Sequence, residues 1–230
     1  MIRGVIFDVG GPLDLETEFE AAIDADIRLG LRNEGLNVDE AAWAEAHRIA
    51  VDTCAPSLYR SVIWQLTGGD YGRSVRIYEW MEGRAHERSL FELRPGMPEI
   101  LTELKLRGLK LGLAANQPLR ALDDLAAHGI GDFFDNSGIS AVYGFRKPDV
   151  RLFLRACEDL GLEPAQCIMV GDRIDNDVVP AKLLGMRTVR IRTGRHRDQK
   201  PRSWDEMPDV EVEDAAGILK GVLHIIEEAG

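Results

Sequence analysis

In the second half of the chain, short apolar runs alternate with helical segments, and this alternation restricts the fold more than any other feature. The runs "LKLGLAAN" (109–116), "CIMVGD" (167–172) and "RTVRIRTG" (187–194) are typical of buried strands, and helical patterns separate them. A turn at "FFDNSGIS" (133–140) is expected to lead into a further short strand, and the last 22 residues read as a strand and a helix. Strands joined through helices run parallel within one sheet. The pattern therefore predicts an α/β fold.

The segment between about residues 16 and 91 has a helical pattern and no convincing strand. Its clearest helical stretches are 15–35, 37–54 and 72–88. This segment reads as an all-helical insertion, and its aromatic residues are expected mainly in its core. They are Trp43, Trp64, Tyr71, Tyr78 and Trp80.

The run "GVIFDV" near the amino terminus reads as a first strand of the same parallel sheet, although the helical insertion follows it directly. The predicted core domain is therefore discontinuous, with residues 1–14 and 92–230, and residues 15–91 form a helical cap domain. Ligands of open α/β sheets bind at the carboxyl ends of the strands. An insertion that leaves the sheet there is expected to act as a lid.

Composition narrows the range of partners. The 230 residues carry a net charge of -11, which argues against nucleic acid or an anionic membrane as the main partner. The basic stretch 187–202 is better explained as a solvated loop than as a nucleic-acid patch. No apolar run is long enough to span a bilayer, and three scattered cysteines fit a reducing cytoplasm better than a disulfide framework or a zinc site. The sequence neither predicts nor excludes a homo-oligomer, because no residue pattern indicates the oligomeric state.

Polar residues occur where several predicted strands end. Asp8 follows the first strand, Asn116 the second, and Asp172 and Asp177 occur in "GDRIDND", while Lys147 occurs in the loop "GFRKPD". Taken singly, each has a structural explanation as a capping or solvated residue. Several acids in one crevice repel each other unless a cation neutralises them, and an all-oxygen set suits Mg²⁺. The set therefore predicts a magnesium site.

These segments together resemble the haloacid dehalogenase superfamily, most of whose members are phosphatases. "FDVGG", "LGLAAN", "RKPD" and "VGDRIDNDVVPAKLLGM" are similar to its four motifs in order, and the resemblance covers nearly the whole chain. It implies a Rossmann-like parallel sheet core with an inserted helical cap, and Asp8 as a covalent nucleophile towards phosphorus. It also implies that Asp8, the Gly10 carbonyl, Asp172 and Asp177 hold Mg²⁺, and that Lys147 is catalytic and binds phosphate.

The chain departs from the family pattern at two catalytic positions. Gly10 stands where the phosphatases usually have the aspartate that protonates the leaving group, and Ala115 replaces a serine or threonine that binds a phosphoryl oxygen. Backbone N–H groups of Gly10, Gly11 and Asn116 are still expected to hold phosphoryl oxygens, in a phosphate site that includes Ala115 and Lys147.

The resemblance and its departures lead to three functions. The first is a Mg²⁺-dependent phosphatase of low or restricted activity, which acts on a small phosphorylated metabolite through an aspartyl-phosphate. The alternative is a catalytically impaired protein that binds a phosphorylated metabolite or regulates. A 2-haloacid dehalogenase is a distant alternative, since those enzymes work without metal and usually have serine where this chain has Asp172.

Overall fold

The structure is a computed structural model that describes residues 1–85 and 90–229. It divides into two compact units by its internal contacts. Residues Met1–Leu15 and Phe91–Gly230 form one, here named the core unit, and Glu16–Leu90 form the other, named the helical unit.

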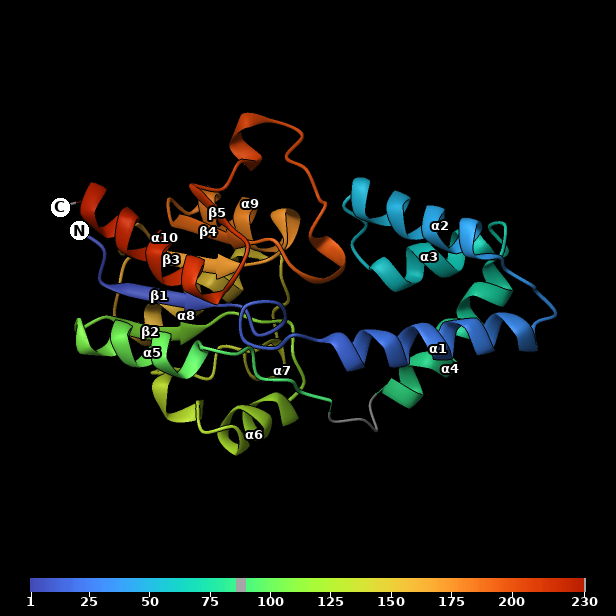
Figure 1. The fold of residues 1–230 in the computed structure, drawn as a ribbon, viewed down its shortest axis with the longest axis horizontal. Coiled ribbons are helices and arrows are strands. Elements are labelled where there is room, and N and C mark those ends of the chain that lie inside the picture. The colour runs from blue at the N-terminus through green and yellow to red at the C-terminus, as the bar shows by residue number, and fades with distance from the viewer. Residues whose placement is uncertain (86–89, 230) are drawn as a thin grey trace. The chain divides into compact units, whose positions relative to one another are not determined.

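The core unit contains a parallel sheet in the order β2-β1-β3-β4-β5 (Figure 1). Every residue of β1 and β3 is buried, as expected for central strands that are covered on both faces. The predicted α/β fold with a parallel sheet is confirmed. The strands are β1 (Gly4–Phe7), β2 (Lys110–Leu113), β3 (Cys167–Gly171), β4 (Arg187–Ile191) and β5 (Val210–Val212).

Helices cover both faces of the sheet (Figure 1). The α-helices of the core unit are α5 (Met97–Leu106), α6 (Arg120–Ala127), α7 (Ser140–Tyr143), α8 (Val150–Leu160), α9 (Val179–Leu183) and α10 (Ala215–Glu228). Alternate side chains of β1 enter two different hydrophobic cores: Val5 and Phe7 lie with α5 and α10, whereas Ile6 lies with α8 and α9. This period of two fixes the register of the strand, because a slip by one residue would exchange the two sets.

The outer edge of β2 is covered by side chains of the segment 135–139. The Asp135 carboxylate accepts a hydrogen bond from the N–H of Leu111 at 2.9 Å, and the amide oxygen of Asn136 accepts one from the N–H of Leu113 at 2.7 Å. These contacts satisfy backbone donors that an open edge strand would expose.

The short strand predicted at 133–140 is therefore wrong. One residue of the segment, Ile139, forms an isolated bridge with Ala115, and α7 begins at the next residue. The physical reason is that side chains accept hydrogen bonds from the N–H groups of Leu111 and Leu113, while separate backbone hydrogen bonds, such as that from the N–H of Asp135 to the carbonyl of Leu111 at 2.7 Å, do not continue into a regular ladder.

The helical unit is all-helical within its described residues and has its own hydrophobic core. Its helices are α1 (Thr17–Asn33), α2 (Glu40–Asp52), α3 (Leu58–Leu66) and α4 (Tyr71–Ala85). Each contributes an apolar face, for example Ile27 from α1, Val62 from α3 and Ile77 from α4. The helical pattern predicted through residue 88 lies outside the described residues beyond Ala85.

The aromatic residues of the helical unit divide between its core and its surface. Trp43 is buried, and Tyr78 and Trp80 pack against the core. Trp64 and Tyr71 are 47% and 75% exposed, so their predicted place in the core is wrong. They lie on either side of the turn between α3 and α4.

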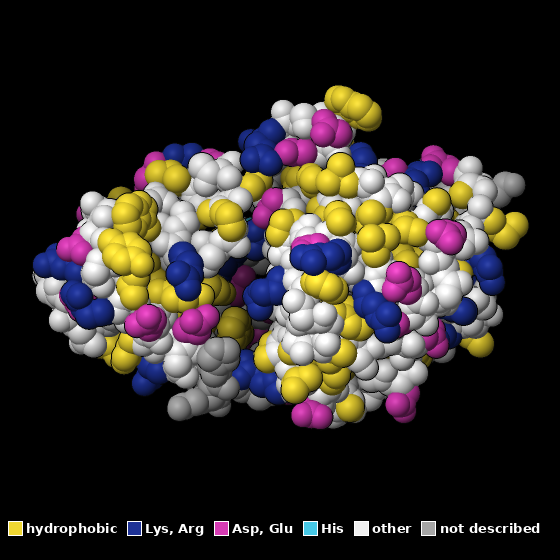
Figure 2. All heavy atoms as spheres, turned by 180° about the vertical axis from the view of Figure 1, so that it is seen from behind, with side chains coloured by type: hydrophobic (Ala, Val, Ile, Leu, Met, Phe, Trp, Pro, Cys, Tyr) yellow, Lys and Arg dark blue, Asp and Glu magenta, His cyan; other side chains and the backbone are white. Residues whose placement is uncertain are grey.

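The surface is mixed in charge. On the face drawn in Figure 2, basic and acidic side chains are interspersed over both units, with apolar side chains between them. A search of the described helices finds none with the length and apolar character required to cross a bilayer.

We predict that Gly138→Ala destabilises the chain by about 1–3 kcal/mol, the usual range for forced overpacking. A Cβ at this position would lie 1.8 Å from the carbonyl oxygen of Leu113, so the edge segment would have to move away from β2. Urea unfolding measures the change. Gly83→Ala is the control, because a Cβ there meets nothing within 4 Å, and alanine in an exposed helix is neutral or stabilising. Equal midpoints for Gly138→Ala and the parent would contradict the prediction.

Candidate active site

Strands β1 and β3 are neighbours, and an aspartate follows each of them. Phe7 is paired with Val170 in the parallel register, so Asp8 and Asp172 leave the same end of the sheet. Their carboxylates meet that of Asp177, which lies in the turn after β3, and one oxygen of each lies within 4.8 Å of the others. All three residues are buried. The structure therefore brings together three acids that are separated by up to 169 positions in the chain.

The ammonium group of Lys147 joins two of these acids. Its Nζ lies 2.7 Å from Oδ2 of Asp8 and 2.6 Å from Oδ1 of Asp177. The second oxygen of each carboxylate is also used, because Asp8 accepts a hydrogen bond from the N–H of Val9 at 2.8 Å, and Asp177 from that of Arg173 at 2.9 Å. The Asp172 carboxylate accepts no hydrogen bond from the described residues. It is therefore the acid with the most free coordination capacity.

Burial and mutual repulsion shift the pKa values of the cluster. Burial raises the pKa of Asp8 to about 6, although Lys147 opposes the shift. Burial, followed by the charges of Asp177 and Asp8, raises the pKa of Asp172 well above its ordinary value. Burial alone would lower the pKa of Lys147, but the two carboxylates beside it raise the value above its usual range. Burial is the largest cause of the shifts of the two aspartates, and repulsion between neighbouring carboxylates adds to it.

This charge distribution fits a divalent cation. Three carboxylates and one ammonium leave two negative charges in excess when all are ionised. The donor atoms are all oxygens, as Mg²⁺ prefers, and a bound Mg²⁺ would neutralise the excess. The residues present therefore fit the ion.

Two glycines allow the acids to approach the backbone closely. A Cβ on Gly171 would lie 2.3 Å from Cγ of Asp177, so only glycine admits this carboxylate beside the end of β3. Gly11 has a φ of 83° and lies against Asp172, where a Cβ would be 2.8 Å from that of the aspartate. An L-residue at position 11 would meet both backbone strain and a steric clash.

Asn116 fixes the backbone at Lys147. Its Oδ1 accepts a hydrogen bond from the N–H of Lys147 at 2.7 Å, and its Nδ2 donates one to the carbonyl of Lys147 at 3.1 Å. The end of β2 thus holds the loop that carries the lysine. The sequence predicts Asn116 as a phosphate-binding residue. In the structure, its side chain holds the backbone of Lys147.

The backbone N–H groups predicted to hold phosphoryl oxygens differ in their availability. Gly11 donates its N–H to the carbonyl of Asp14, and Ala115 donates its N–H to that of Gly138. Both groups are already used, so neither is a free donor. Within the described residues, the N–H groups of Gly10 and Asn116 donate to no acceptor. Only these two are open donors.

Comparisons with known proteins agree with this geometry. The family model described as a haloacid dehalogenase-like hydrolase matches residues 2–185, which is most of the chain. The chain belongs to this family. The resemblance to it and the expectation of a hydrolase are thereby confirmed.

Named relatives of this hydrolase are phosphatases. It is 34% identical over 146 residues to the glyceraldehyde 3-phosphate phosphatase of Methanopyrus kandleri, which covers 62% of this chain and 63% of that protein. It is 28% identical to the enzyme of the same name from Methanocaldococcus jannaschii, over 96% of this chain and 99% of the relative. A solved haloacid dehalogenase-type phosphatase from Thermococcus onnurineus has 25% identity and a TM-score of 0.62, over 96% and 98% of the two chains.

Two buried arginines support the site of this hydrolase, and neither belongs to a motif. Arg94 donates from Nε to the carbonyl of Gly11 at 2.7 Å, and Arg190 donates from Nε to the carbonyl of Asp172 at 3.1 Å. Both guanidinium groups therefore hold backbone that carries the acid cluster. Their partners lie 83 and 18 positions away, a spacing that no periodic pattern signals.

The basic stretch 187–202 pairs largely within its own neighbourhood. Arg190 forms an ion pair with Glu211 at 2.7 Å. Arg192 and Arg197 both form ion pairs with Glu213, at 3.3 Å and 2.9 Å respectively. Such pairing reduces the positive potential that the stretch could offer an anion. The interpretation of 187–202 as a solvated loop is wrong for its first five residues, because Arg187–Ile191 form strand β4 and Arg190 is buried.

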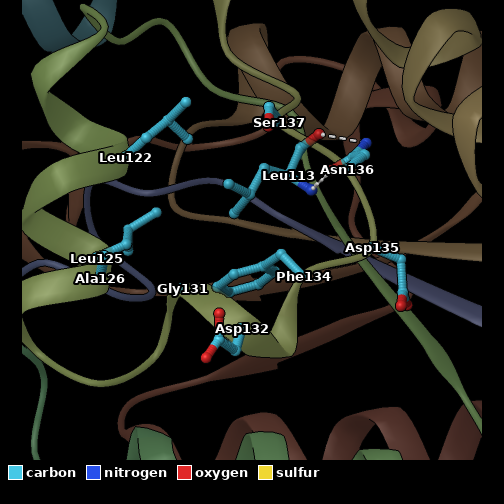
Figure 3. A pocket seen from close by; sticks show the side chains of 10 residues that line it. All are labelled: Leu113, Leu122, Leu125, Ala126, Gly131, Asp132, Phe134, Asp135, Asn136 and Ser137. Atoms are coloured by element: carbon cyan, nitrogen blue, oxygen red, sulfur yellow. Dashed lines mark hydrogen bonds between the residues drawn. The ribbon is translucent and has the colours of Figure 1, made fainter.

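A pocket of about 320 Å³ is lined by residues of β2, of α6 and of the segment 131–137 (Figure 3). Leu113, Leu122, Leu125 and Phe134 supply apolar side chains to it. The dashed lines of Figure 3 show that Asn136, on its border, is already bonded to Leu113. The pocket shares no residue with the acid cluster.

We predict that Asp172→Asn stabilises the metal-free protein at pH 8. The pKa of Asp172 is higher in the folded than in the unfolded chain, so ionisation of this group lowers stability as pH rises from about 4 through the folded pKa. The amide removes this penalty, and each kcal/mol gained raises Tm by about 2–4 °C. Thermal unfolding in EDTA between pH 4 and pH 8 tests it.

The difference between variant and parent is expected to shrink towards pH 4, where the folded carboxyl is protonated and the unfolded one is only about half ionised. Asp123→Asn serves as control, because Asp123 is exposed on α6. A lower melting temperature for Asp172→Asn than for the parent at pH 8 in EDTA would rule the explanation out.

Proposed function

We propose that this hydrolase is a Mg²⁺-dependent phosphatase that acts on a small phosphorylated metabolite through an aspartyl-phosphate at Asp8. The observation that carries the proposal is the buried Asp8 carboxylate, bound by Lys147 at 2.7 Å within a cluster of three acids. The names of the relatives support phosphate-ester hydrolysis as the reaction. The described residues form no disulfide, which is compatible with a cytoplasmic location.

Each site residue has a proposed role. The Asp8 carboxylate attacks phosphorus and displaces the leaving oxygen, and Lys147 offsets charge on the phosphoryl oxygens. The N–H groups of Gly10 and Asn116 bind phosphoryl oxygens. Asp8, the Gly10 carbonyl and Asp172 hold Mg²⁺, which when bound stabilises negative charge on the transferring group. Asp177, which the sequence also predicts as a Mg²⁺ ligand, is proposed to keep Lys147 in place, since both of its carboxylate oxygens accept hydrogen bonds.

Glycine at position 10 limits this chemistry. A positioned general acid contributes about 10²–10⁴-fold to the rate, mainly when the leaving oxygen is a poor leaving group. Asp14 is a poor replacement, because its Oδ1 already accepts a hydrogen bond from the N–H of Glu92 at 2.9 Å. Glyceraldehyde 3-phosphate is an alkyl phosphate and is therefore a demanding substrate for this site. Acyl and aryl phosphates, whose leaving groups depart unprotonated, suit it better.

The alternative function is a phosphometabolite-binding protein with little turnover. Gly10 and Ala115 favour it, because two polar catalytic side chains of the family are absent. A phosphate-ester panel and direct binding measurements separate the two. Turnover of any ester or acyl phosphate supports the enzyme, whereas tight binding without turnover supports the binding protein. Halide release from 2-chloropropionate in EDTA would instead support the distant dehalogenase alternative.

We expect Asp8→Asn to abolish turnover and trapping by beryllium fluoride, since an amide is a poor nucleophile and a weaker Mg²⁺ ligand. Lys147→Ala is expected to weaken inorganic phosphate binding and to lower turnover by about 10²-fold or more, because a buried charge on the phosphoryl oxygens is lost. Steady-state kinetics and calorimetry measure both. Lys220→Ala, at an exposed position on α10, is the control. Full activity of Asp8→Asn would mean that another group attacks phosphorus.

We also expect the rate to depend steeply on the pKa of the leaving group. p-Nitrophenyl phosphate should react faster than alkyl phosphates, and Gly10→Asp should raise alkyl-phosphate turnover more than aryl-phosphate turnover. Gly10 does not have a positive φ, so its backbone is compatible with aspartate. A leaving-group series with the parent and with Gly10→Asp tests this. Equal slopes, in a parent already efficient on sugar phosphates, would show that another acid protonates the leaving group.

A further inference from the structure

We propose that Arg94 is a positioning residue for the Mg²⁺ site, because it holds the turn that carries Gly10 against Asp172. Arg94 is outside the motifs of the sequence and is buried, at 8% exposure. The inference rests on the proposed Mg²⁺-dependent function, in which the carbonyl of Gly10 and the carboxylate of Asp172 are ligands.

The contacts of Arg94 join the loops that follow two different strands. Its Nε donates to the carbonyl of Gly11 after β1 at 2.7 Å, and its Nη2 donates to Oγ1 of Thr193 after β4 at 2.9 Å. Its own N–H donates to the carbonyl of Leu13 at 2.7 Å. Strand β3, which leads to Asp172, lies between β1 and β4 in the sheet. One side chain thus ties together the loops on either side of Asp172.

Gly10 depends on its neighbours for its position. Within the described residues, its N–H and carbonyl form no hydrogen bond, whereas Gly11 donates its N–H to Asp14 and gives its carbonyl to Arg94. Gly11 also lies against Asp172, as the 2.8 Å distance from a hypothetical Cβ shows. Arg94 therefore supplies a side-chain contact to the Gly11–Pro12 peptide group, which follows the Gly10–Gly11 peptide group directly.

The charge of Arg94 has the opposite effect from its hydrogen bonds. The guanidinium lies in the field of Asp172 and Asp14, and its positive charge disfavours a nearby cation. If Arg94 acted only through charge, its removal would tighten Mg²⁺ binding. If it positions a ligand, its removal weakens binding, by about 10–100-fold for typical residues that orient metal ligands. The sign of the change therefore distinguishes the two effects.

The test is calorimetric titration of the metal-stripped full chain with Mg²⁺. We expect Arg94→Met to raise the Kd about tenfold or more. Arg94→Lys keeps the charge but not the planar fork that reaches both acceptors, so it should also weaken binding. Thr193→Val removes one of the two contacts and leaves all charges, and should weaken binding less. Tighter or unchanged binding in Arg94→Met, with Arg94→Lys equal to the parent, would overturn the proposal.

Arg192→Met is the matched control. Arg192 precedes Thr193 but pairs with Glu213 at 3.3 Å and does not contact Gly11, so its loss should leave the Kd unchanged. Circular dichroism identifies variants that do not fold. If Arg94→Met does not fold, the Kd values of Arg94→Lys and Thr193→Val decide the outcome: a raised Kd supports the proposal and an unchanged Kd overturns it.

Two results separate this inference from the proposed function. A parent that binds no Mg²⁺ at millimolar concentration overturns both. A parent that binds Mg²⁺, and loses it on Asp172→Asn while all Arg94 and Thr193 variants bind normally, overturns only the role of Arg94.

Discussion

The ion pair between Lys147 and two buried carboxylates is the contact on which the acid cluster depends. Without its ammonium group, Asp8, Asp172 and Asp177 would present three like charges within a few ångströms of one another, in a region removed from water. Even with it, the pKa values of Asp8 and Asp172 stay raised. Lys147 therefore reduces the repulsion between the carboxylates but does not neutralise all of their negative charge.

The surrounding fold is arranged to keep this ion pair in place. The amide of Asn116 holds the backbone of Lys147 from the end of β2, and the absence of a side chain on Gly171 admits Asp177 beside the end of β3. Since β2, β1 and β3 are adjacent in the sheet, three neighbouring strands each contribute one element of the site. The parallel sheet is thus the reason that residues from distant parts of the chain meet.

The sequence predicts those parts of the molecule that repeat with a regular period or fall at strand ends. Asp8, Asp172 and Lys147 could be chosen because each stands next to a recognisable strand or helix. Arg94 could not be chosen, because its function lies in hydrogen bonds to Gly11 and Thr193, which no local pattern encodes. The same holds for the edge of β2, where the side chains of Asp135 and Asn136 accept hydrogen bonds from N–H groups of the strand. Whether Trp64 and Tyr71 are buried or exposed also depends on tertiary neighbours, which the hydrophobic character of a residue does not specify.

The departures at Gly10 and Ala115 remove side chains but leave the backbone of the site intact. Electrostatic stabilisation of a transferring phosphoryl group uses a buried lysine, a cation and backbone N–H groups, and none of these depends on the side chain at either position. Proton transfer to the leaving group does need a side chain at position 10 or an equivalent acid. Under the proposed function, the chain therefore loses one hydrogen bond to the phosphoryl group at Ala115 but keeps the other groups that act on it, and it lacks the side chain that acts on the departing alcohol. In this site the identity of the leaving group, rather than the affinity for phosphate, should limit which metabolites are hydrolysed.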